Sequence, residues 1–140
     1  MTTGDQARAT ILLVDDFRDM VMATRIFLEG EGYRVLEAYD GVQCLEILER
    51  VTPDLIILDV MMPRLDGWAT LTRIQADERW KCVPVLMLTA LNDPVNVKIG
   101  GELGCTWYYT KPVTDYCDFA RVIERILSGS DVPEARFSSC

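Results

Sequence analysis

The chain contains no histidine among its 140 residues. Without an imidazole it cannot form a Ser-His-Asp triad or a histidine zinc site, and it carries no phosphohistidine of its own. Any phosphoryl group that reaches this protein must therefore come from another molecule.

A membrane-spanning run and a basic cluster are also missing. No apolar stretch approaches the roughly 20 residues needed to cross a bilayer, and the first residues do not resemble a signal peptide. The 14 Lys and Arg residues stand against 22 Asp and Glu residues, a net charge of −8, without the concentrated positive charge that nucleic-acid binding requires. We therefore expect a cytoplasmic protein that neither enters membranes nor binds nucleic acid.

The five cysteines include no C-x-x-C pair and are odd in number. Pairs and even sets are typical of metal sites and disulfide frameworks, so we expect reduced thiols instead. The cysteines are Cys44, Cys82, Cys105, Cys117 and Cys140.

What the chain does have is an ordinary globular composition, with 49% hydrophobic and 26% charged residues. The length fits one domain. We expect an N-terminal segment over residues 1–9, the domain over residues 10–127, and a flexible tail or the start of a linker over residues 128–140. Whether the domain stands alone or belongs to a larger protein stays open.

Short apolar runs alternate with segments of helical periodicity. Such runs are typical of buried parallel strands. The predicted strands cover residues 10–14, 33–38, 55–58, 85–88 and 106–109. Five strands alternating with five helices predict a doubly wound five-stranded parallel α/β sheet, in the flavodoxin-like order 2-1-3-4-5, with helices on both faces.

Two of the predicted helices have distinctive sequences. One carries an apolar face from Cys44 to Val51. Another, over residues 93–103, is expected to start at Asn92 or Asp93. It contains Gly100 and Gly101, each of which weakens a helix by roughly 1 kcal/mol relative to alanine. We expect this helix to be the most mobile one.

Polar residues follow four of the predicted strands. Asp15 and Asp16 come after the first strand, Asp59 after the third, Thr89 after the fourth and Lys111 shortly after the fifth. Ligands of open α/β sheets bind at the carboxyl ends of the strands. The sequence therefore predicts that three carboxylates, a hydroxyl and an ammonium group meet at one edge.

These groups suit a metal and a phosphoryl group. Neighbouring carboxylates repel one another unless a cation lies between them, and oxygen ligands favour Mg2+, for which Mn2+ should substitute. Lys111 and the Thr89 hydroxyl can neutralise and hydrogen-bond phosphoryl oxygens. If Asp59 attacks phosphorus in line, an aspartyl phosphate results. Taken alone, Asp15 or Asp16 could equally cap the first helix.

The residues around these positions resemble those of a two-component response regulator receiver domain, of the single-domain, chemotaxis-regulator-like kind. The resemblance runs from about Thr10 to Leu127. It rests on Val14-Asp15-Asp16, on Leu58-Asp59-Val60-Met61-Met62-Pro63 followed by Asp66-Gly67, on Leu88-Thr89-Ala90, and on Tyr108-Tyr109-Thr110-Lys111-Pro112. These motifs occur together, in order and at spacings that fit one domain.

The resemblance implies that Asp59 accepts a phosphoryl group from a sensor histidine kinase or a histidine phosphotransfer protein. It implies that Asp16, Asp59 and the backbone carbonyl of Met61 bind Mg2+ directly, while Asp15 acts mainly through water. The protein would then be a phosphorylated switch rather than an enzyme. Because the apolar Met61 and Leu91 cannot orient an attacking water, we expect the phosphoryl group to be lost slowly.

The resemblance also implies how the switch is read. Thr89 and Lys111 would contact the phosphoryl group, the peptide bond between Lys111 and Pro112 would be cis, and the Tyr108 ring would turn inward as Thr89 moves. An unidentified protein target would bind the helix over residues 93–103, the strand through Tyr108, and the helix over residues 114–127. A phosphorylation-dependent dimer is a further outcome, although Val113 stands where a dimerising DNA-binding subgroup often has phenylalanine.

Two other functions remain as alternatives. A metal-dependent phosphatase of the haloacid dehalogenase type also uses an aspartate nucleophile with Mg2+, but it needs a second aspartate two residues later, where this chain has Met61 after Asp59 and Phe17 after Asp15. A pseudo-receiver would act only as a docking module. The complete set of carboxylates argues against that reading.

Overall fold

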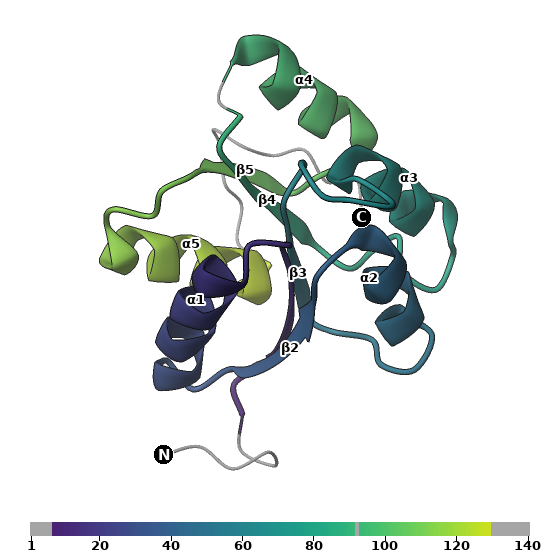
Figure 1. The fold of residues 1–140 in the computed structure, drawn as a ribbon. Coiled ribbons are helices and arrows are strands. Elements are labelled where there is room, and N and C mark those ends of the chain that lie inside the picture. The colour runs from purple at the N-terminus through teal and green to yellow at the C-terminus, as the bar shows by residue number, and fades with distance from the viewer. Residues whose placement is uncertain (1–6, 92, 130–140) are drawn as a thin grey trace.

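The computed structural model describes residues 7–91 and 93–129, which form a five-stranded parallel sheet with helices on both faces (Figure 1). The strands are β1 (Thr10–Val14), β2 (Arg34–Ala38), β3 (Leu55–Leu58), β4 (Val85–Thr89) and β5 (Trp107–Thr110). The helices are α1 (Arg18–Gly30), α2 (Gly41–Leu48), α3 (Gly67–Ala76), α4 (Pro94–Leu103) and α5 (Tyr116–Ser128). The strand order β2-β1-β3-β4-β5 is the predicted one.

Parts of three sequence predictions lie outside the described residues. These are most of the N-terminal segment, most of the tail, and the alternative cap Asn92.

The strands are apolar on both faces, so that each strand contributes to two cores. Ile11 and Leu13 of β1 pack with α1 and α5, whereas Leu12 and Val14 pack with α2, α3 and α4. The same alternation continues along the sheet because successive side chains of a strand point to opposite faces. Figure 1 shows the two layers of helices on either side of the sheet.

Four of the five helices begin at an aspartate whose side chain accepts a hydrogen bond from an amide of the first turn: Asp40, Asp66, Asp93 and Asp115. Helix α1 begins at Phe17 instead, without a side-chain cap. The carboxylate of Asp15 accepts a hydrogen bond from the Phe17 amide at 3.0 Å, but neither Asp15 nor Asp16 caps the helix. The capping alternative is therefore wrong for α1, and both carboxylates are left to the edge of the sheet.

Some predicted boundaries were wrong by a few residues. Helix α2 ends at Leu48 and not at Val51. Helix α5 begins at Tyr116, because Asp115 takes the capping position in an extended conformation. No helix among residues 7–91 and 93–129 combines the length and the hydropathy that a bilayer crossing needs.

The cysteine prediction holds only in part. Cys44, Cys105 and Cys117 are free thiols. Cys82 is disulfide-bonded, so the expectation of a fully reduced set is wrong at this position. Cys140 lies outside the described residues.

Candidate functional site

Three carboxylates meet at the carboxyl edge of the sheet. Asp15 and Asp16 follow β1, and Asp59 follows the neighbouring strand β3, where its amide donates to the Val14 carbonyl at 3.0 Å. One carboxylate oxygen from each of the three side chains lies within 4.8 Å of the others. Asp15 and Asp59 are only 3% and 7% exposed, while Asp16 is open to solvent. The site is thus a buried pair of carboxylates with a third at its mouth.

Lys111 reaches this cluster from the loop after the edge strand β5. Its Nζ lies 2.6 Å from Asp15 Oδ2 and 3.0 Å from Asp59 Oδ2. The Lys111 amide donates to the Thr89 carbonyl at 2.8 Å, which continues the pairing of β5 with β4 past the end of the strand. The peptide bond between Lys111 and Pro112 is cis. One ammonium group therefore bridges two carboxylates that come from different strands.

Burial and pairing act against each other in this cluster. Burial raises the pKa of the Asp15 carboxyl, and the hydrogen bond from Lys111 opposes that rise. For Lys111, burial alone would lower the pKa of the ammonium group, but the bonds to Asp15 and Asp59 hold that pKa above its ordinary value. The charged form of Lys111 is accordingly the stable one.

The residues fit a divalent cation. When all three carboxylates are ionised, the single ammonium group leaves two negative charges without a partner in the cluster. A hollow of about 510 Å³ opens beside Asp16 and holds room for metal-bound water. It is lined by Asp16, Val60, Met61, Met62, Pro63 and Asp66. Hard oxygen ligands next to a water-accessible space are typical of Mg2+ sites.

The predicted switch residues both contact the loop after β4. Thr89 is buried, and its Oγ1 accepts a hydrogen bond from the Leu91 amide at 3.4 Å. The Tyr108 hydroxyl donates to the Leu91 carbonyl. Two side chains expected to move together are thus joined through one residue of this loop.

Sequence reasoning missed the partners that surround these positions. The Tyr108 ring stacks on Trp68 of α3, with centroids 6.4 Å apart and planes inclined by 28°. Arg64, in the loop after β3, pairs with Asp40 at 2.9 Å. The sequence Asp40-Gly41 before a helix indicates a cap, but nothing near Arg64 indicates that the two would pair.

Known proteins match the chain over most of its length. The profile of the response regulator receiver domain family matches residues 11–124. The DNA-binding response regulator MtrA of Mycobacterium bovis is 36% identical over 134 residues, which cover 96% of this chain and 58% of that regulator. The chain thus spans little more than half the length of this relative.

Two solved structures with bound metal are similar. The receiver domain of the sensor histidine kinase PA1611 from Pseudomonas aeruginosa, with magnesium coordinated in its active-site cleft, is 30% identical at a TM-score of 0.80, covering 87% of this chain and 99% of that one. The Mn2+-bound response regulator Rcp1 is 26% identical at a TM-score of 0.72, covering 86% of this chain and 92% of that one.

Proposed function

Because this chain belongs to the response regulator receiver domain family, and so functions in two-component signalling, we propose that Asp59 is the residue that accepts the phosphoryl group. The observation that carries the proposal is that Asp59 is buried beside a second carboxylate, Asp15, and bonds the Lys111 ammonium group at 3.0 Å. The chain has no histidine, so the donor is the phosphohistidine of a sensor histidine kinase or a histidine phosphotransfer protein.

Each group of the site has a part in the transfer. An oxygen of Asp59 attacks phosphorus as the phosphorus–nitrogen bond to the donor breaks, and Lys111 and Thr89 bind the phosphoryl oxygens. Asp16, Asp59 and the Met61 carbonyl are the residues that would hold Mg2+, with Asp15 acting through water. When bound, the ion offsets negative charge on the phosphoryl oxygens.

The proposed switch depends on the hydrogen bond that the Thr89 hydroxyl accepts from the Leu91 amide before phosphorylation. When the Thr89 hydroxyl turns to the phosphoryl group, its bond with the Leu91 amide is lost. The Tyr108 hydroxyl is bonded to the same residue, so the loop, the ring and α4 shift together. The proposed readout surface is α4, β5 and α5, and its ligand is a downstream protein target.

The proposed functional unit is the receiver domain over residues 10–127. The similar region of MtrA belongs to a protein named for DNA binding. The net charge of −8 does not favour nucleic-acid binding by the domain itself, and the proposed output is protein contact.

The decisive experiment is labelling of the purified chain by radioactive acetyl phosphate. We expect labelling that is stable in acid, labile in base, dependent on Mg2+ and absent from Asp59→Asn. A matched control is Asp54→Asn at the opposite edge of the sheet, where Asp54 accepts a bond from the Thr10 amide at 2.8 Å and an asparagine can still do so. Undiminished labelling of Asp59→Asn would place the acceptor elsewhere.

The lifetime of the phosphoryl group is a second test of the same site. Met61 is 64% exposed in the loop after β3, and the Leu91 amide donates to the Thr89 hydroxyl in the loop after β4. Polar replacements there can orient a water for attack on phosphorus, so Met61→Asn with Leu91→Lys should shorten the lifetime in a single-turnover assay. An unchanged decay rate would show that water access is controlled elsewhere.

A further inference from the structure

The loop between β3 and α3 carries Met61, and it is fixed at both of its ends. On one side the Gly67 amide donates to the Val60 carbonyl at 2.7 Å, and on the other the Gly41 amide of α2 donates to the Leu65 carbonyl at 3.2 Å. A Cβ on Gly41 would lie 2.5 Å from that carbonyl oxygen, so α2 touches the loop directly. Met61 lies between these two anchors.

Arg64 forms a second contact between this loop and α2. Its Nε lies 2.9 Å from Asp40 Oδ2, although the Arg64 side chain is 55% exposed and that of Asp40 only 9%. The other oxygen of Asp40 accepts the Gln43 amide at 2.8 Å and starts α2. One buried carboxylate therefore holds the helix with one oxygen and the loop with the other.

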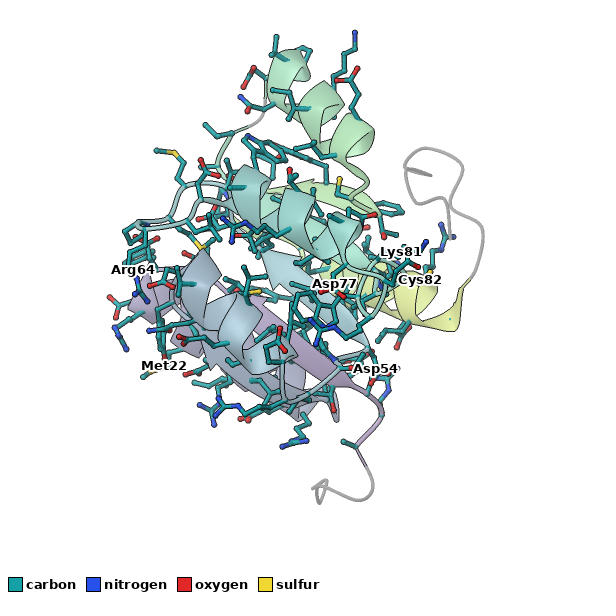
Figure 2. All side chains as sticks on the ribbon, turned by 90° about the vertical axis from the view of Figure 1, so that its right-hand side faces the viewer. Met22, Asp54, Arg64, Asp77, Lys81 and Cys82 are labelled. Carbon is teal, nitrogen blue, oxygen red and sulfur yellow. The ribbon has the colours of Figure 1, made fainter. Side chains whose placement is uncertain are left out.

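The backbone of Arg64 adopts a conformation that favours glycine. Its φ is +65°, in the left-handed region that costs L-residues free energy. A glycine would reach this φ without strain but could not reach Asp40. The ion pair with Asp40 therefore offsets part of the free energy that the backbone conformation of Arg64 costs. Figure 2 shows Arg64 at the end of the molecule opposite Asp54, on the side where β3 ends.

We propose that the ion pair between Arg64 and Asp40 acts as a latch that positions the Met61 carbonyl for the divalent cation. The inference rests on the proposed metal site. Mg2+ demands near-ideal octahedral geometry with ligands at about 2.1 Å, so a small displacement of one carbonyl weakens binding. Arg64 and Asp40 do not touch the cation themselves; they are positioning residues that act through the loop.

The test measures binding of Mn2+ alone to the full chain by titration calorimetry. Arg64→Gln removes the ion pair and should weaken Mn2+ binding about 10-fold, the lower end of the loss known for removing a group that holds a metal ligand. Asp40→Asn keeps an oxygen that can cap α2 and should give the same loss. The matched control is Arg73→Gln, which removes the same charge from α3 beside the groove that Arg64 also lines.

The double variant Asp40→Asn with Arg64→Gln separates a latch from two independent effects. If both residues act through one ion pair, the double variant binds Mn2+ as the single variants do; independent effects would multiply to about 100-fold and overturn the latch. Equal weakening by Arg73→Gln would overturn it as well, because charge alone would then be the cause.

Arg64→Gly distinguishes positioning from general stability. Glycine relieves the strain at φ +65°, so this variant should unfold at a higher urea concentration than Arg64→Gln while losing the same Mn2+ affinity. If Arg64→Gly binds Mn2+ as the unmodified chain does, the latch is wrong. If the unmodified chain itself binds no Mn2+, the proposed metal site fails instead.

Discussion

Helix α4 precedes β5 in the chain and α5 follows it, yet the two helices are held in different ways. Both begin at a capping aspartate and both end at a glycine with positive φ. Of the residues of α4 only Gly100 is buried, whereas α5 buries Phe119, Val122, Ile123 and Ile126. Caps start and stop a helix, but buried side chains attach it. The helix expected from its glycines to be mobile is thus the one with little apolar attachment.

Two adjacent tyrosines of β5 repeat this contrast. The Tyr109 hydroxyl donates to Asp118 of α5 at 3.0 Å, and its ring meets Phe119 edge-on with centroids 5.0 Å apart. Tyr108 points to the other face, where its hydroxyl bonds a loop carbonyl instead of a helix side chain. Tyr109 is bonded to the well-buried helix α5, and Tyr108 to the loop that leads into α4, which buries little.

The largest expected effect is the loss of the α5 anchor. Phe119 is fully buried, so Phe119→Ala should lower the free energy of unfolding by about 3–5 kcal/mol, measured by urea denaturation. The partly buried Leu103 of α4 is the counterpart, and Leu103→Ala should cost about 1 kcal/mol. Equal losses from the two helices would break the comparison.

The next effect tests how closely α4 approaches the sheet. A Cβ on Gly100 would lie 3.1 Å from Cys105 Sγ and 3.2 Å from Tyr108 Cδ2. Gly100→Ala should therefore destabilise the protein by about 1–3 kcal/mol in urea, although alanine is the better helix former by about 1 kcal/mol. If the variant is more stable instead, α4 can move away from Cys105 and Tyr108 without loss of stability. The helix would then contribute even less to packing than its burial indicates.

A smaller effect is expected from the Tyr108 hydroxyl. Tyr108→Phe removes the bond to the Leu91 carbonyl and should cost about 1 kcal/mol. Hydrogen exchange should become faster in α4 and stay unchanged in α5. The matched variant Tyr109→Phe should show the reverse pattern, because its hydroxyl bonds Asp118. Faster exchange in both helices from either variant would show that β5 does not separate them.

The last effect is a loss of stability in alkali. Burial raises the pKa of both phenols to about 12, with Asp93 adding to the shift for Tyr108 and Asp118 for Tyr109. Since the pKa of an unfolded tyrosine is about 10, the neutral phenols stabilise the folded state below that pH, and this contribution is lost as the pH rises toward 12. Urea midpoints measured between these pH values should fall less steeply when both residues are phenylalanine.

Much of the fold and of the site could be predicted because both depend on local patterns. Continuous apolar runs set the strands, and parallel strands place Asp15, Asp59 and Lys111 at one edge whatever the loops between them do. Helix ends were less accurate: the apolar face extends to Val51, but the helix stops at Leu48. Periodicity marks which side a residue faces and not where hydrogen bonding ends.

Side-chain pairings across loops could not be predicted. Arg64 and Asp40 are 24 residues apart, and their contact depends on a left-handed backbone turn that no residue type near Arg64 indicates. The same holds for Lys111, which was expected to contact a phosphoryl group at this edge and which bonds both Asp15 and Asp59 directly. Such contacts follow from the placement of whole elements, which a local pattern does not contain.

The bridge made by Lys111 stabilises the unphosphorylated, metal-free protein. An ammonium group seated on two carboxylates is a counterion that the chain supplies itself and that no chelator can remove. Starved of magnesium, the protein should therefore stay folded and lose only its capacity to be labelled. Folding would then depend on the Lys111 bridge, and phosphorylation on the divalent cation.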